Sequence, residues 1–315
     1  MFHRSSFLIL YSILPNEFKT SETQTMNTSS YYVPPQSKLP FYTAAALFAL
    51  VIGLTMVLTT DLAVIPFIIA AIAVASVMAL SYIWFSAVVN ENLTNLHSDQ
   101  MDRSYRWGMF WFITTEVLFF GAFFATLFHT KLVSLPWLAG ELGREYNTIL
   151  WEQFVYTWPL LSNPNPEIFS GPKGIIDPLG LPLVNTILLI SSSFTVSFAH
   201  HALKSNHRRQ VVWWLLASIL MGAIFLFFQG EEYVEAYQHY SLTLDSGIYG
   251  ATFFILTGFH GMHVTLGAIM LTVILLRVMR GHFTPEKHFG FEAVSWYWHF
   301  VDVVWIGLFL FVYLL

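Results

Sequence analysis

The residues best suited to chemistry in this sequence are acids and histidines that lie inside long apolar stretches. Glu116 lies in one such stretch, and a bare carboxylate at mid-membrane depth costs about 2.5 to 3.5 kcal/mol or more, so we expect it to be protonated or paired. His260 and His263 are three residues apart, as are His299 and Asp302, and this spacing places each pair on one helical face. These five residues form a predicted buried polar cluster.

Three kinds of role are open to this cluster. The first is structural, with the acid hydrogen-bonded to a neighbouring helix, and the second is proton transfer or lipid binding. The third is a metal or haem site, because histidine and carboxylate ligands suffice for zinc or iron. No HExxH-type motif organises the groups, and their spacing also suits hydrogen bonds between helices. We therefore predict no catalytic residue and no metal in this chain.

The composition indicates that these groups are embedded in a membrane. Of 315 residues, 56% are hydrophobic and only 10% are charged, which leaves too few polar groups to solvate an ordinary globular surface. The chain has no cysteine, which excludes disulfides, thiolate nucleophiles and cysteine-ligated metals. We therefore expect most of the chain to be surrounded by the lipid bilayer.

Seven apolar stretches are long enough to cross about 30 Å of hydrocarbon. They cover residues 40–60, 62–89, 107–129, 181–203, 211–230, 247–276 and 293–315. The predicted fold is an all-α polytopic membrane protein with seven transmembrane helices. We expect a flexible N-terminal extension over 1–36, with Met26 a candidate start, a two-helix hairpin over 37–95 closed at Asp61, and a five-helix bundle over 96–315 with a long outer loop over 132–180.

The distribution of basic residues predicts the orientation. The N-terminal side and the loops after spans 2, 4 and 6 hold eleven Lys and Arg residues, and the opposite side holds only Lys131, Arg144 and Lys173. By the positive-inside rule the N-terminus is cytoplasmic and the C-terminus is outside. Glu231, Glu232 and Glu235 then form a solvated acidic rim on the outer side, or a docking site for a basic partner such as a cytochrome c.

Four segments in order along the chain resemble the subunit III family of haem-copper cytochrome c oxidases, from about residue 40 to the C-terminus. No single segment is specific to this family, but the four together, in order and at positions that agree with the predicted spans, are specific. They are Arg106-Trp107-Gly108-Met109 with Thr115-Glu116-Val117-Leu118-Phe119-Phe120; Leu183-Val184-Asn185-Thr186 with Ala199-His200-His201; Gln229-Gly230-Glu231-Glu232-Tyr233 with Gly258-Phe259-His260-Gly261-Met262-His263; and Phe289-Gly290-Phe291-Glu292-Ala293 with Trp296-Tyr297-Trp298-His299-Phe300-Val301-Asp302.

The resemblance implies a non-redox subunit that packs on subunit I, together with subunit II and a small subunit IV, in a complex that passes electrons from cytochrome c to dioxygen and pumps protons. Haem and copper would be held by the partner subunits. This chain would bind phospholipids in a cleft between helices 1–2 and 3–7 and support proton uptake and enzyme stability. Glu116 matches the family's carbodiimide-reactive glutamate. Trp84, Glu91, His97 and Arg277 fall near the family's lipid-headgroup positions.

The hairpin of spans 1 and 2 favours the cytochrome c branch over quinol oxidases, whose subunit III usually has five helices. The long outer loop favours a bacterial source, and hence the inner membrane with a periplasmic C-terminus. The rival hypotheses are a proton-coupled transporter built around Glu116, His260 and Asp302, and a haem-binding redox subunit. We expect no nucleic-acid partner.

Overall fold

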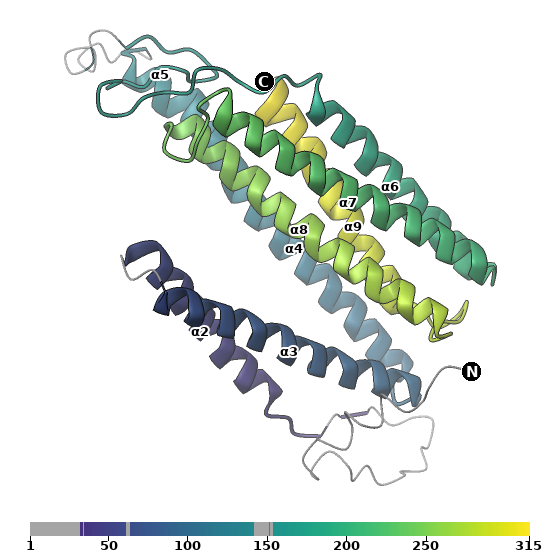
Figure 1. Ribbon diagram of the computed structural model, residues 1–315. Helices are drawn as coiled ribbons and strands as arrows, with labels where there is room; N and C mark the ends of the chain where they lie inside the picture. The colour runs from purple at the N-terminus through teal and green to yellow at the C-terminus, as the bar shows by residue number, and fades with distance from the viewer. Residues whose placement is uncertain (1–31, 34, 61–63, 142–150, 152–153) are drawn as a thin grey trace. The chain divides into compact units, whose positions relative to one another are not determined.

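The computed structural model describes residues 32–33, 35–60, 64–141, 151 and 154–315. Every regular element in this part of the chain is a helix, and seven helices are long and apolar enough to span a membrane (Figure 1). This confirms the predicted all-α polytopic class. The predicted extension up to residue 31, the Asp61 connection and Arg144 lie outside the described residues.

The chain divides into two compact units, residues 1–104 and residues 105–315. The first unit contains the hairpin of α2 (Leu39–Thr59) and α3 (Ile65–Leu93). Small residues are buried where these two helices cross, namely Ala46 and Gly53 on α2 and Ala70 and Ala73 on α3. A Cβ atom on Gly53 would lie 2.9 Å from the backbone nitrogen and Cα of Ala70. The two backbones can approach this closely only because glycine stands there.

The helix α4 (Asp99–His129) begins in the first unit and continues into the second. A π-helical segment, Thr130–Ser134, joins it to the short helix α5 (Leu135–Leu138). The sequence places the start of this span at residue 107 and its end at 129. The helix begins earlier, at Asp99, and ends at His129 as expected, and the π-helical segment and α5 continue the helical stretch to Leu138. The apolar window marks only the part that matches the hydrocarbon, whereas polar turns can continue a helix beyond it.

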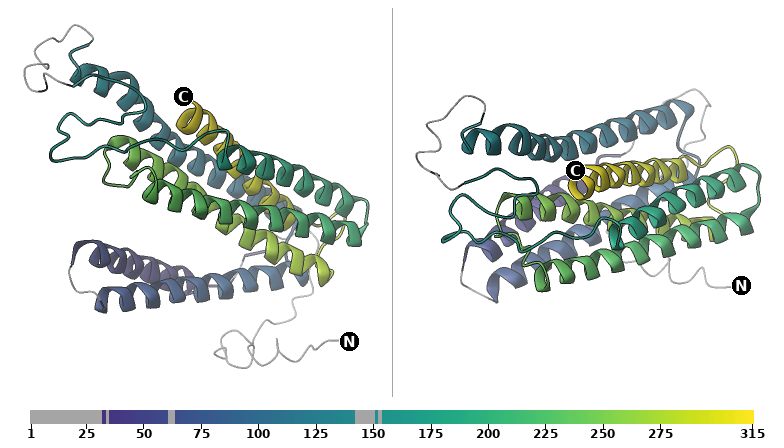
Figure 2. Two further views of the ribbon diagram at one scale, coloured as in Figure 1. Left: turned by 45° about the horizontal axis from the view of Figure 1, so that its top comes forward. Right: turned by 90° about the horizontal axis from the view of Figure 1, so that it is seen from above.

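Four further helices complete the second unit: α6 (Leu181–Lys204), α7 (Arg208–Gln238), α8 (Ile248–Met279) and α9 (Phe289–Leu308), which ends in a π-helical turn, Phe309–Leu314. The helix α7 packs between α6 and α8, while α9 packs against both α6 and α8. Both views of Figure 2 show these helices lying side by side. Local signals set their ends: Pro182 stands in the first turn of α6, and Asn206 and Gly281 adopt positive φ after α6 and α8.

The indole of Trp298 on α9 holds this bundle together. It is fully buried, and its N–H donates a hydrogen bond to Ser192 Oγ on α6 at 2.9 Å. A Cβ atom on Gly222 of α7 would lie 2.8 Å from one ring atom, and a Cβ atom on Gly267 of α8 would lie 2.7 Å from another. One side chain therefore contacts three other helices, and two glycines make room for it.

Phenylalanine rings join α4 to the rest of the second unit. Phe119 meets Phe259 of α8 edge to face with ring centroids 5.0 Å apart, and Phe120 approaches Phe300 of α9 at 6.1 Å. Such edge-to-face pairs stabilise contacts beyond the area they bury, by about 0.5 to 1.5 kcal/mol each. These rings position Glu116, the acid on the same stretch of α4.

Candidate functional site

Glu116 on α4 is paired with His263 on α8. Glu116 Oε2 lies 2.9 Å from His263 Nε2, and the exposed fractions of the two side chains are 20% and 6%. The ring of Phe120 lies 4.9 Å from the imidazole, and the ring of Tyr297 stacks on it at 6.3 Å. The expectation that the acid is paired with a neighbouring helix therefore has a specific partner in the structure.

The hydrogen bonds of His263 determine what this pair can do. His263 Nδ1 lies 2.6 Å from the carbonyl oxygen of Phe259, and because a carbonyl can only accept, Nδ1 carries a hydrogen. His263 Nε2 therefore shares a single proton with Glu116, either as an imidazolium beside a carboxylate or as a neutral imidazole beside a carboxylic acid. Both states are hydrogen-bonded and locally neutral, which suits a low-dielectric environment.

His299 and Asp302 are joined through a serine of α6. The hydroxyl of Ser193 donates to Asp302 Oδ2, and Ser193 Oγ lies 2.8 Å from His299 Nδ1. Because the serine proton points to the carboxylate, His299 Nδ1 is the donor to the serine oxygen. Asp302 is 5% exposed, and its second oxygen has no hydrogen-bond partner among the described residues. These groups form a short ordered chain of hydrogen bonds between α6 and α9.

His260 has different neighbours. It is fully buried, its Nε2 donates to the carbonyl oxygen of Val301 at 3.2 Å, and its ring packs against those of Phe225 and Trp305. The five residues of the predicted cluster thus divide into three sets of contacts: Glu116 with His263, His299 with Asp302, and His260 with the backbone of α9.

The four lipid residues of the sequence prediction lie in both units. In the first unit Trp84 is 38% exposed on α3, and His97 Nε2 lies 3.7 Å from Glu91 Oε2. In the second unit the guanidinium of Arg277 lies over the ring of Phe283 at 4.3 Å, near the end of α8. The first unit therefore holds an acid and histidine pair, and the second unit holds a cation.

The expected acidic rim is wrong for one of its three members. Glu231 is exposed, but Glu232 is fully buried and accepts a hydrogen bond from the Tyr313 hydroxyl in the π-helical turn after α9. The signal was present in the sequence. Phe225, Gln229, Glu232 and Ala236 recur at helical spacing and form the buried face of α7. The acid lies on that face because α7 continues to Gln238, beyond the predicted end of the span at residue 230.

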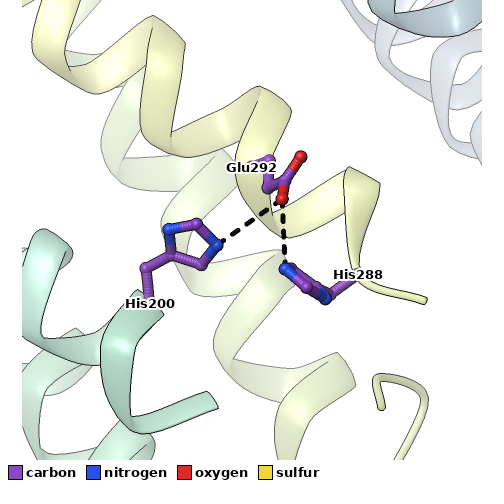
Figure 3. A group of neighbouring side chains, drawn as sticks. All are labelled: His200, His288 and Glu292. Carbon is purple, nitrogen blue, oxygen red and sulfur yellow. Dashed lines mark ion pairs between the residues drawn. The ribbon is translucent and has the colours of Figure 1, made fainter. Parts of the chain in front are cut away.

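A second polar cluster, at the other end of α9, was not predicted as a site. His200 of α6, His288 just before α9 and Glu292 of α9 converge, and their ligand atoms all lie within 4.8 Å of one another (Figure 3). Arg106 of α4 forms an ion pair with the same glutamate. His288 and Glu292 are at i, i+4 spacing, but Arg106 lies 186 positions from Glu292, so local spacing could have indicated only one of these contacts.

The architecture defines the class of protein: a polytopic helical membrane protein whose buried polar groups are paired between helices. Comparison with known proteins defines the family. The family described as cytochrome c oxidase subunit III matches residues 29–162 and 163–315. The chain belongs to the cytochrome c oxidase subunit III family, whose members are subunits of an oxidoreductase. The resemblance of the four sequence segments is thereby confirmed.

Individual relatives support the assignment over most of the chain. Cytochrome c oxidase subunit 3 of Pongo abelii is 41% identical over 235 residues, which is 74% of this chain and 78% of the relative. The protein of the same name from Gadus morhua is 40% identical over the same shares. That from Tetraodon nigroviridis is 38% identical over 265 residues, covering 82% of this chain and 89% of the relative.

Proposed function

We propose that this chain is an accessory, non-redox subunit of a proton-pumping cytochrome c oxidase. In this proposal it packs on subunit I beside subunit II and a small subunit IV, and the partner subunits hold the haem and copper and receive electrons from cytochrome c. The chain contributes stability, bound phospholipid and support for proton uptake. The α2–α3 hairpin supports the cytochrome c branch rather than a quinol oxidase.

The local pairing of the intramembrane titratable groups carries this proposal. Glu116 is hydrogen-bonded to His263, and Asp302 to Ser193, in two separate sets of contacts. A transporter needs such groups to exchange ions along a pathway, whereas groups paired in this way join helices. Reconstitution of the purified chain into liposomes separates the two functions. We expect no proton flux above that of empty liposomes, and flux that is lost in Glu116→Gln would support the transporter instead.

Phospholipid binding is the second part of the proposal. Arg277 is the cation suited to an anionic headgroup in the second unit, and Trp84, Glu91 and His97 are the candidate lipid residues of the first unit. Arg277→Ala should reduce the phospholipid retained by the purified complex, as measured by mass spectrometry after delipidation. Arg209→Ala is the matched control, because Arg209 is an exposed arginine at the start of α7. Equal losses in both variants would contradict a specific site.

The membrane and orientation are also part of the proposal. The chain is a multi-pass membrane protein, and we assign it to a bacterial inner membrane with a cytoplasmic N-terminus and a periplasmic C-terminus. The support is the distribution of Lys and Arg and the long outer loop. The relatives described above come from vertebrates and give no support to a bacterial source. Protease accessibility of tags placed in the loops of inverted and right-side-out vesicles tests the orientation.

A further inference from the structure

The cluster of His200, His288 and Glu292 has the composition and geometry of a metal site. Figure 3 shows both imidazoles directed toward the same carboxylate from different parts of the bundle. Glu292 Oε1 lies 3.1 Å from His288 Nε2 and 3.7 Å from His200 Nε2. Glu292 and His288 are only 13% and 7% exposed at their side chains, so the group is largely shielded from water.

The tautomer of His288 leaves a lone pair directed at the carboxylate. His288 Nδ1 lies 3.2 Å from the carbonyl oxygen of Thr284, and because the carbonyl can only accept, Nδ1 is the donor. In the neutral ring Nε2 then carries a lone pair. This Nε2 is buried, and despite its short distance to Glu292 it has no hydrogen-bond partner of acceptable geometry in the part of the chain that the structure describes. Two lone-pair atoms this close repel each other unless a proton or a metal ion lies between them.

His200 also directs a buried imidazole nitrogen at Glu292. Its Nε2 is also buried without a hydrogen-bond partner among the described residues, and it is directed at the same carboxylate oxygen. The imidazole stacks on Phe291 with ring centroids 5.5 Å apart and planes 24° apart, which fixes its orientation. Two unpartnered imidazole nitrogens beside one carboxylate are unexpected in a set of groups that only joins helices, because buried polar atoms are normally paired.

Arg106 does not occupy the position between these three groups. It pairs with Glu292 Oε2, the other carboxylate oxygen, and its guanidinium also lies over the ring of Phe289 at 4.8 Å. This ion pair leaves Oε1 directed at the two histidines.

We propose that His200, His288 and Glu292 bind a divalent zinc ion, with the fourth coordination position open to water. Nitrogen and oxygen ligands at about 2.1 Å from one tetrahedral zinc ion lie roughly 3.4 Å from each other. The two observed distances from Glu292 Oε1, 3.1 and 3.7 Å, bracket that value. Two imidazoles with one carboxylate suit zinc better than calcium or magnesium, which prefer oxygen ligands alone. The ion would join α6 to α9.

The test is zinc content of the intact complex. The complex is purified through a tag on this chain, treated with a chelator, incubated with zinc sulfate, desalted and analysed for metals, with its haem content as the measure of assembly. His288→Ala should bind one zinc equivalent less than the unsubstituted complex. His201→Ala is the matched control, because His201 is the exposed neighbour of His200 on α6 and is not part of the cluster. It should bind the full amount.

A second variant and a spectroscopic measurement keep the test decisive if the first variant misfolds. If His288→Ala fails to assemble, His200→Asn replaces it in the zinc-content measurement. X-ray absorption at the zinc edge of the unsubstituted complex should show two imidazole ligands and one carboxylate. The same spectrum should be absent from the assembled cluster variant. Equal zinc content in the cluster variant and the unsubstituted complex, or an equal loss in His201→Ala, would overturn the proposal.

Discussion

The packing around Trp298 makes a quantitative prediction for Gly267→Ala. The added methyl carbon would lie 2.7 Å from one ring atom of Trp298 and 2.9 Å from another, well inside normal carbon contact distance. The ring cannot move away freely, because Gly222 lies against another part of the ring and Ser192 accepts its N–H. Inserting a methyl group into such a core typically costs about 1 to 3 kcal/mol.

Gly261→Ala is the control that isolates this cost. Gly261 lies on the same helix, and a Cβ atom there would meet nothing within 4 Å. Both substitutions change helix propensity alike, so the difference between the two variants reports the overpacking alone. A difference of about 1 to 3 kcal/mol corresponds to roughly 5- to 150-fold in the folding equilibrium, or about 2 to 4 °C in the unfolding midpoint for each kcal/mol.

The assay is thermal unfolding of the purified complex in detergent, followed by release or aggregation of this chain. Gly267→Ala should unfold at a lower temperature than Gly261→Ala, and Trp298→Phe should cost less in the Gly267→Ala background than alone, because the smaller ring leaves room for the methyl group. Equal midpoints for the two glycine variants, or strictly additive effects with Trp298→Phe, would refute the described packing.

Three further predictions follow from the polar contacts. Tyr313→Phe removes the hydroxyl that donates to buried Glu232, so it should lower stability by about 1 to 3 kcal/mol in the same thermal assay, and an unchanged midpoint would contradict that contact. Glu116→Gln should leave the proton-pumping stoichiometry of the reconstituted complex intact; loss of pumping with normal assembly would show that the acid relays protons. Burial, reinforced by two nearby arginines, lowers the pKa of His282 in the folded state. As the pH drops below about 6.5, the usual histidine pKa, the unfolded chain binds a proton that the folded chain does not, so the stability should fall. His282→Asn should flatten that decline in midpoints measured across pH, and an identical slope would contradict the assignment.

The sequence predicts the membrane architecture well because hydrocarbon thickness imposes a length on each span. All seven predicted spans are helices in the structure. The ends are less predictable, because polar turns continue a helix outside the hydrocarbon at no large cost. Asp99 to Arg106 belong to α4 although the apolar window begins at residue 107. The same limitation led to the assignment of Glu232 to a solvated rim.

For contacts between distant residues, the sequence predicted that a partner was needed but did not identify the partner. The cost of a buried charge indicated that Glu116 needs a partner, and the i, i+3 spacing placed His263 on a shared helical face with His260. Which histidine meets the acid depends on the rotation of α8 against α4, which no local pattern specifies; in the structure Phe259 of α8 packs on Phe119 of α4. The role of Gly267 and Gly222 was similarly hidden, because the ring they accommodate lies on a third helix.

The most direct test of the central claim is purification of the complex from its native membrane through a tag on this chain, with its visible spectrum and subunit masses recorded together. Membership of a respiratory oxidase predicts haem absorption bands and a large partner subunit that stays with the tagged chain. Colourless material in which the tagged chain runs alone would contradict the accessory-subunit account.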